Sequence, residues 1–234
     1  MRISYIIGLL VLLLTACEYD NFDAPESKFT GSITYNGTPL GFASGDVFFR
    51  LWEIGDWPTP APIEVLVAQD GSFSALLFDA EYKLIIPADG QNPFISNTNP
   101  ETSSDTIIVK ISGSKKMDIE VLPYYIINNV SYTTSGAQVS ATCSVSKINT
   151  GATARDIANV TLLIGDTQFV SNSRNIGKAS VTGAGITDMG NIPLKVTINK
   201  PKVNQTEFYA RIGVQISGVT DLVYSPVTKV TVQF

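Results

Sequence analysis

The sequence contains no histidine and only two cysteines, Cys17 and Cys143. Without histidine, Ser-His-Asp and Cys-His catalysis lose their usual base, and zinc, copper and non-haem iron lose their commonest ligand. Basic residues do not cluster along the chain, which argues against a nucleic-acid partner and against an anionic membrane surface. An EF-hand loop and a phosphate-cradling glycine motif are missing as well.

Long hydrophobic runs are also missing, except for one at the start of the chain, from Tyr5 to Leu14. This run is too short to span a bilayer as a permanent helix, and Arg2 precedes it as a positive n-region. The following Leu14-Thr15-Ala16-Cys17 resembles a bacterial lipobox, in which signal peptidase II cuts before a lipidated cysteine. We therefore predict a signal peptide over residues 1–16 and a lipid on Cys17. The alternative is an ordinary secretory signal that ends beside a cysteine by chance.

Residues 17–27 are acidic and rich in turn formers, which predicts a tether. They resemble the acidic export signal of surface-exposed lipoproteins in gut-dwelling anaerobic Gram-negative bacteria, although a solvated linker would have the same composition. We expect an outer-membrane lipoprotein that faces the cell exterior. Removal of residues 1–16 from the 234-residue chain leaves 218 residues with 15 basic and 21 acidic side chains. With Cys17 lipidated, Cys143 has no cysteine partner, and we expect it to be a small apolar core residue.

The rest of the chain predicts an all-β fold with two β-sandwich modules in series, over residues 28–122 and 123–234. Short alternating or apolar runs recur between Gly, Pro, Asn and Asp, with no helical period of useful length. Asn36-Gly37 and Asp70-Gly71 each predict a two-residue hairpin turn. The expected strands of the first module are 29–35, 47–53, 63–68, 72–77, 81–86, 106–111 and 116–122. Those of the second module are 126–133, 138–147, 159–164, 178–182, 194–198, 208–216 and 227–234.

Particular segments carry a resemblance to known families. Residues 28–33 with 37–40 look like the opening of a carboxypeptidase-regulatory or transthyretin-like domain, and segments 49–53, 70–73 and 77–84 continue it. Residues 208–214 resemble the F strand of a fibronectin-III or immunoglobulin-like module, with Tyr209 where such folds often place a corner tyrosine. The whole mature chain is similar to an uncharacterised family of outer-membrane lipoproteins found beside SusC/SusD-like glycan-uptake genes. The resemblance implies fold and location, and it supplies no catalytic residues.

The candidate ligand-binding residues are aromatic and polar side chains in two loops. Sugar recognition needs flat apolar faces together with amides or carboxylates for the hydroxyl groups. The candidates are Trp52, Asp56 and Trp57 around the proline-rich segment 58–62, and Gln91, Asn92 and Phe94 in a later loop. Trp57 and Phe94 would supply ring faces, and Asp56, Gln91 and Asn92 the polar contacts. The alternative is that Trp52 fills the core and that Trp57 packs on the prolines or on the second module.

These observations favour a cell-surface lipoprotein without catalytic activity and without a cofactor or metal. We expect it to be a glycan-binding or assembly component of a polysaccharide-uptake system, partnered by SusC/SusD-like proteins. A fimbrial subunit or tip adhesin assembled by strand donation is the alternative. That alternative is weakened because residues 29–35 contain no Arg or Lys at which a maturation protease would cut. An enzyme is the third hypothesis, and the carboxylates are scattered over expected turns instead of paired.

Overall fold

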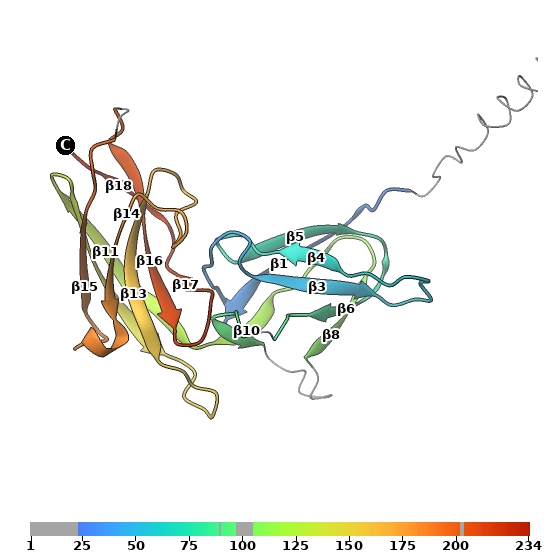
Figure 1. Cartoon of the computed structure of the whole chain (residues 1–234). Coiled ribbons are helices and arrows are strands. Elements are labelled where there is room, and N and C mark those ends of the chain that lie inside the picture. The colour runs from blue at the N-terminus through green and yellow to red at the C-terminus, as the bar shows by residue number, and fades with distance from the viewer. Residues whose placement is uncertain (1–22, 89, 97–104, 202–203) are drawn as a thin grey trace, which may run out of the picture.

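The structure is a computed structural model that describes residues 23–88, 90–96, 105–201 and 204–234. The predicted signal peptide, Cys17 and tether residues 17–22 lie outside the described residues. In the described part the chain is almost wholly β, with a single 3₁₀ turn at Gly183–Gly185. Among these residues, no helix is long and apolar enough to cross a membrane. Figure 1 shows two β-sandwich domains side by side, which confirms the predicted fold class.

The first domain packs two sheets around a core rich in phenylalanine. One sheet is built on the central strand β1 (Ser27–Tyr35), which pairs antiparallel with β5 (Ser72–Leu77) and parallel with β10 (Ile119–Pro123). The short strands β2 (Thr38–Pro39), β7 (Phe94–Ser96) and β9 (Lys115–Lys116) complete that sheet. The facing sheet has the order β4 (Ile63–Leu66), β3 (Phe48–Glu53), β6 (Ala80–Ile85) and β8 (Thr106–Ile111). Rings of Phe29, Phe49 and Phe73 meet between the sheets at centroid distances of 4.8 to 6.4 Å.

The second domain packs a three-stranded sheet on a larger one. The smaller sheet has the order β11 (Tyr125–Ser135), β12 (Gln138–Lys147) and β15 (Ile192–Thr197). In the larger sheet, β13 (Ile157–Gly165) lies between β14 (Gly177–Thr182) and β16 (Glu207–Ile216). Strand β16 also pairs with β17 (Val223–Tyr224) and β18 (Thr228–Thr231). Cys143 lies in this core at 2% exposure, as expected, and burial raises the pKa of its thiol to about 11.

One predicted hairpin is confirmed and the other is wrong. Asn36 and Gly37 have φ angles of 49° and 72°, and they join β1 to β2 as a two-residue turn. Asp70 and Gly71, by contrast, do not close a hairpin, because β4 pairs with β3 in one sheet and β5 pairs with β1 in the other. The turn is instead a corner between the two sheets. It is closed locally by Asp70, whose carboxylate accepts hydrogen bonds from the amide and hydroxyl of Ser72 at 3.0 and 2.6 Å.

Two expected strands are broken by contacts that the sequence pattern does not reveal. The run 116–122 divides into β9 and β10, because Asp118 turns aside to accept a hydrogen bond from the Ser32 amide at 2.9 Å. The final run, expected over 227–234, is paired only over β18, and residues 225–227 separate it from β17. Short strands β2, β7 and β17 were not expected, because two or three residues show no periodicity.

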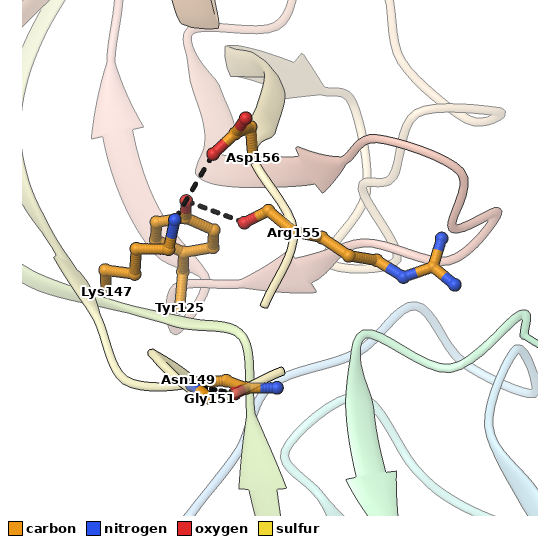
Figure 2. A network of polar contacts seen from close by, with 6 residues as sticks. All are labelled: Tyr125, Lys147, Asn149, Gly151, Arg155 and Asp156. Carbon is orange, nitrogen blue, oxygen red and sulfur yellow. Dashed lines mark hydrogen bonds and ion pairs between the residues drawn. The ribbon is translucent and has the colours of Figure 1, made fainter. Parts of the chain in front are cut away.

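Polar contacts at the start of β11 fasten the linker between the domains to the second domain. The hydroxyl of Tyr125 donates to the Arg155 carbonyl at 2.9 Å, and Lys147 contacts Asp156 at 3.2 Å beside the same ring (Figure 2). The Arg155 side chain extends away from this pair, donates to the Ser217 carbonyl at 3.3 Å, and lies 5.9 Å from the Tyr124 ring centroid. Tyr124 and Tyr125 are thus held by the second domain where the chain leaves the first.

Candidate functional site: the cleft between the domains

An open cleft with a volume of about 850 Å³ lies between the two domains. Both domains contribute to it, through the β1–β2 hairpin and the sheet corner on one side and β11, β16 and β18 on the other. Ligand sites are found preferentially at such domain junctions. The lining side chains that matter below are Tyr35, Asn36, Asp70, Asn128, Gln168, Tyr209 and Lys229.

Two half-buried tyrosines give the cleft its aromatic surface. Tyr35 is the last residue of β1 and continues the inward row of Ile33, so its ring reaches past the end of the core. Tyr209 lies on β16, where Phe208 and Ala210 face the core of the second domain and Tyr209 points to the opposite face. On that opposite face, Tyr209 packs against a cluster in which Ala43 of the first domain meets residues of the second. Strand alternation therefore places a tyrosine from each domain on the cleft.

The polar groups of the cleft are amides, and its charges are already engaged within the protein. Asn36, Asn128 and Gln168 supply amide side chains. The Asp70 carboxylate is held by the amide and hydroxyl of Ser72, and these hydrogen bonds lower its pKa from the ordinary value. Lys229 pairs with Glu207 at 3.0 Å. The surface thus combines aromatic faces with neutral hydrogen-bonding groups.

The cleft has a fixed back wall because a β-bridge joins the two domains. Gly41 and Tyr224 pair antiparallel, and the Tyr224 amide donates to the Gly41 carbonyl at 2.8 Å. A Cβ at position 41 would lie only 2.4 Å from the Tyr224 carbonyl oxygen, so only glycine permits this approach. This single bridge links the segment after β2 in the first domain to β17 in the second.

A buried arginine reinforces the bridge. Arg211 is 1% exposed, and its guanidinium lies 4.4 Å from the centroid of the Tyr224 ring. Its Nε donates to the Ser225 carbonyl at 2.8 Å and its Nη2 to the Gln69 carbonyl, across the junction, at 3.0 Å. Burial lowers the pKa of Arg211 to about 10, yet its nearest polar partners are acceptors that suit the charged form. Arg211 therefore ties the sheet corner of the first domain to the second.

A small apolar cluster adds to the same junction. Ala43 of the first domain packs with Leu163, Val170, Leu222 and Tyr224 of the second. The Asp221 amide also donates to the Gln91 carbonyl at 2.9 Å, and the Tyr124 amide to the Pro93 carbonyl at 3.2 Å. Contacts therefore lie on several sides of the linker, and the cleft walls are fixed relative to one another.

The residues predicted to form the sugar site are not brought together. Trp52, Asp56 and Trp57 belong to the end of β3 and the loop after it, beside the start of β6, where the Ile54 amide donates to the Glu81 carbonyl. Gln91, Asn92 and Phe94 lie past the other end of β6, beside the second domain. The length of a strand, roughly 17 Å, separates the two groups.

Two residues of the later loop also have structural roles. Phe94 is 4% exposed and packs on Phe42 at a centroid distance of 5.7 Å, so its assignment as a sugar-stacking ring is corrected. The Asn92 side chain donates to the Pro87 carbonyl at 2.9 Å and shapes the loop. Trp57 remains open to solvent at 52% exposure, over a shallow hollow of about 210 Å³ that it shares with Trp52.

Sequence reasoning missed the cleft because its parts are far apart along the chain. The Asn36-Gly37 turn was a visible signal, yet nothing in the sequence places that turn opposite β16. Tyr209 was noticed as a corner tyrosine and not as a cleft residue. Among the described residues, no group of three or more His, Cys, Asp or Glu side chains is placed to hold a metal ion.

Comparison with known proteins places this architecture in a family. A family described as "Protein of unknown function (DUF3823) N-terminal domain" matches residues 27–122, and one described as "Domain of unknown function (DUF3823_C)" matches residues 125–229. The chain belongs to the DUF3823 family. No curated protein matches it.

Solved DUF3823 structures have the same two-domain fold. One from Parabacteroides merdae is 32% identical to this chain, with a TM-score of 0.75. The match covers 89% of this chain and 100% of the Parabacteroides merdae chain. One from Bacteroides ovatus is 28% identical, with a TM-score of 0.76, and covers 88% of this chain and 100% of its own. A protein from Bacteroides uniformis, provisionally named as carbohydrate binding, is 18% identical with a TM-score of 0.67, and covers 89% of this chain and 100% of its own.

Proposed function

We propose that this DUF3823 protein is a non-catalytic, lipid-anchored protein of the outer cell surface that binds a glycan in the cleft between its domains. The observation that carries the proposal is that Tyr35 and Tyr209, one from each domain, both line a cavity of about 850 Å³. Aromatic faces accept the C–H side of a sugar ring, while amides bond its hydroxyl groups. The provisional name of the Bacteroides uniformis relative is compatible with this role.

The charge of the cleft narrows the ligand class to neutral glycans. Lys229 pairs with Glu207, and the Asp70 carboxylate keeps its negative charge although Ser72 donates to it, so no unpaired positive charge awaits a ligand carboxylate or sulfate. A uronic acid or a sulfated sugar would leave its charge unpaired there, which is costly in a half-enclosed site. Neutral hexose polymers fit the amide groups better.

The wider context completes the proposal. A lipid on Cys17 would hold the protein at the outer membrane, and SusC/SusD-like transport proteins would receive the captured glycan. We also propose that the first domain is transthyretin-like and the second fibronectin-III-like. The parallel pairing of β1 with β10 and the packing of a three-stranded on a five-stranded sheet in the second domain support these types.

Isothermal titration of the Glu18–Phe234 fragment against neutral and acidic polysaccharides tests the proposal. Both hydrophobic cores lie within this fragment, so it retains the fold. We expect binding of a neutral glycan that falls about tenfold or more in Tyr209→Ala and in Tyr35→Ala, because aromatic anchors dominate such sites. Trp57→Ala is the matched control, since it removes an aromatic ring outside the cleft.

Each outcome of the titration is decisive. If no polysaccharide binds, or if binding depends on Trp57 and not on the two tyrosines, the cleft is not the glycan site. Circular dichroism of each variant separates lost binding from lost fold.

A further inference from the structure

The end of the first domain farthest from the cleft gathers three loops around the point where the chain enters. Asp79, in the turn between β5 and β6, accepts hydrogen bonds from the Ser27 hydroxyl and from the Gly113 amide. Gly113 lies in the turn between β8 and β9. The loop after β3 joins them, because the Ile54 amide donates to the Glu81 carbonyl at 2.8 Å. Figure 1 shows this end pointing away from the second domain, with the N-terminal segment leaving beside β5.

This end exposes four large apolar side chains, which we call the distal apolar patch: Ile54, Trp57, Leu76 and Phe78. Their exposed fractions are 43%, 52%, 59% and 46%. Leu76 lies opposite Lys28, one residue from the start of β1, and Phe78 precedes Asp79 in the turn. Leu76 lies on the outer face of β5, and Trp57 lies beside Trp52 at the end of the facing sheet. A single exposed apolar residue needs no explanation, but four at one end of a domain can serve as an interaction surface.

The predicted anchor decides what this surface faces. Nine residues lie between Cys17 and Ser27, where β1 begins, so ten residue-to-residue steps connect the two. Even fully extended, they span at most about 35 Å. A lipid on Cys17 would therefore attach the protein to the bilayer by this end of the first domain, from which β1 leads to the cleft.

The charges at this end are mixed in sign, so attraction to anionic lipid is not the driving force. The basic side chains are Lys28, Lys110, Lys115 and Lys116, and the acidic ones include Glu26, Asp56, Asp79 and Glu81. The basic side chains therefore do not outnumber the acidic ones. The driving force would therefore be apolar contact with the lipid. The amphipathic indole of Trp57 is suited to the boundary between headgroups and acyl chains.

We propose that the distal apolar patch rests on the lipid bilayer and sets the orientation of the protein on the membrane. The contact is weak by itself and becomes effective because the anchor keeps the patch near the surface. This inference rests on the lipid anchor of the proposed function, and it gives Trp57 a role that does not involve the glycan. The cleft is then displayed on the side away from the membrane.

Chemical tethering tests the contact. The fragment Cys17–Phe234 with Trp52→Phe keeps Trp57 as its only tryptophan and is coupled through Cys17 to vesicles that carry a maleimide lipid. Cys143 reacts slowly because it is buried and its pKa is about 11. Lipids brominated on their acyl chains quench an indole at the boundary, so we expect the Trp57 emission of the tethered protein to fall by about half or more relative to unbrominated vesicles.

A matched pair of variants provides the control. Phe78→Ser removes an aromatic ring from the patch, and we expect it to lose most of the quenching. Phe169→Ser removes a ring of nearly equal exposure, 45%, from the second domain, and we expect it to keep the quenching. Pure phosphatidylcholine and mixed phosphatidylglycerol vesicles should give the same result, because the contact is apolar.

The outcomes separate this inference from the proposed function. Equal emission in both vesicle types, or equal loss in both phenylalanine variants, would overturn the membrane contact. Neither result bears on glycan titration, which is made in solution without lipid. Because the lipid is attached chemically, natural lipidation is tested apart, by the mass of the membrane-extracted protein.

Discussion

The two ends of the first domain show aromatic residues in two different settings. At the cleft, Tyr35 is half-buried, supported by its strand and faced by amides, and the second domain fixes the opposite wall. At the distal end, Trp57 and Phe78 lie in loops with about half of each side chain exposed and no facing domain. A supported ring beside polar groups suits a small ligand that needs defined geometry. Loosely held rings on a convex end suit a broad apolar surface such as a bilayer.

Of the substitutions that would distinguish the two ends, Arg211→Met should have the largest effect. It removes the guanidinium that links the two domains behind the cleft. The Ser225 and Gln69 carbonyls would lose a charged donor in a buried position, and we expect the free energy of unfolding to fall by about 3 kcal/mol. Glycan affinity should fall with it, whereas quenching of Trp57 by brominated lipid should persist. Urea denaturation and titration measure the two effects.

Arg50→Ala is the control for that change. Arg50 pairs with Glu64 at 3.7 Å on an exposed sheet face, so its loss should cost less than about 1 kcal/mol. An equal loss in both variants would mean that the Arg211 contacts do not stabilise the junction.

The second effect is a fall in folding stability at alkaline pH, which should occur without a change in binding near neutral pH. Burial raises the pKa of Cys143 to about 11 and that of Tyr132 to about 12, from ordinary values of 9.0 and 10.0. Above pH 9 the unfolded chain loses these protons before the folded chain does, so the contribution of these two groups to stability is constant well below pH 9 and falls towards pH 12. The two groups contribute up to about 2 kcal/mol each. Urea midpoints at pH 7 and pH 11 measure the fall.

Tyr132→Phe should show a smaller fall between pH 7 and pH 11 than the unchanged protein. A fall of the same size would mean that Tyr132 titrates normally in the folded state. Between pH 6 and pH 8 both surfaces should bind without change, because the chain has no histidine.

A smaller effect is expected from Gly37→Val at the lip of the cleft. The φ angle of 72° favours glycine, and a β-branched residue there should cost about 1–2 kcal/mol. The β1–β2 turn would shift and weaken glycan binding, while the distal end should be unaffected. The matched change Gly90→Val meets a similar φ of 76° away from the cleft, so unchanged glycan affinity is expected there. Thermal unfolding and titration of both variants check the prediction.

The smallest effect should come from Trp57→Ala in solution. Because half of this side chain is already exposed, we expect a stability change within about 0.5 kcal/mol and unchanged glycan affinity. Loss of glycan binding in this variant would erase the distinction between the two ends. Side-by-side titration with Tyr209→Ala decides the matter.

Local pattern was enough to predict the class of fold but not the site. Alternation along residues 138–147 predicted β12 with its exact bounds, and Asn36-Gly37 predicted its turn, because both depend on neighbouring residues. The Asp70-Gly71 turn has the same local chemistry, yet its flanking strands join different sheets, which only the packing of the whole domain decides. The assignment of Phe94 as a sugar-stacking ring was wrong for the same reason, since the burial of Phe94 depends on Phe42, fifty-two positions away.

The cleft was beyond prediction because it is made by the contact of two domains. Arg211 on a strand alternating with apolar residues predicts an exposed charge, and only the docking of the first domain buries it. The lysines near the distal end are spread over residues 28–116, and the pairing of β1 with β9 places Lys115 opposite Phe29, the residue after Lys28. Their lack of clustering in the sequence was therefore no guide to their arrangement in space.

Strand β1 has a mechanical consequence. It begins at Ser27, where the predicted anchor would pull, and ends at Tyr35, where the proposed ligand would pull in the opposite direction. Tension between a membrane and a captured polymer would run along this strand. Its hydrogen bonds to β5, across six paired residues, lie perpendicular to that direction and would share the load instead of parting one at a time. The same strand that positions the cleft is thus arranged to resist shear.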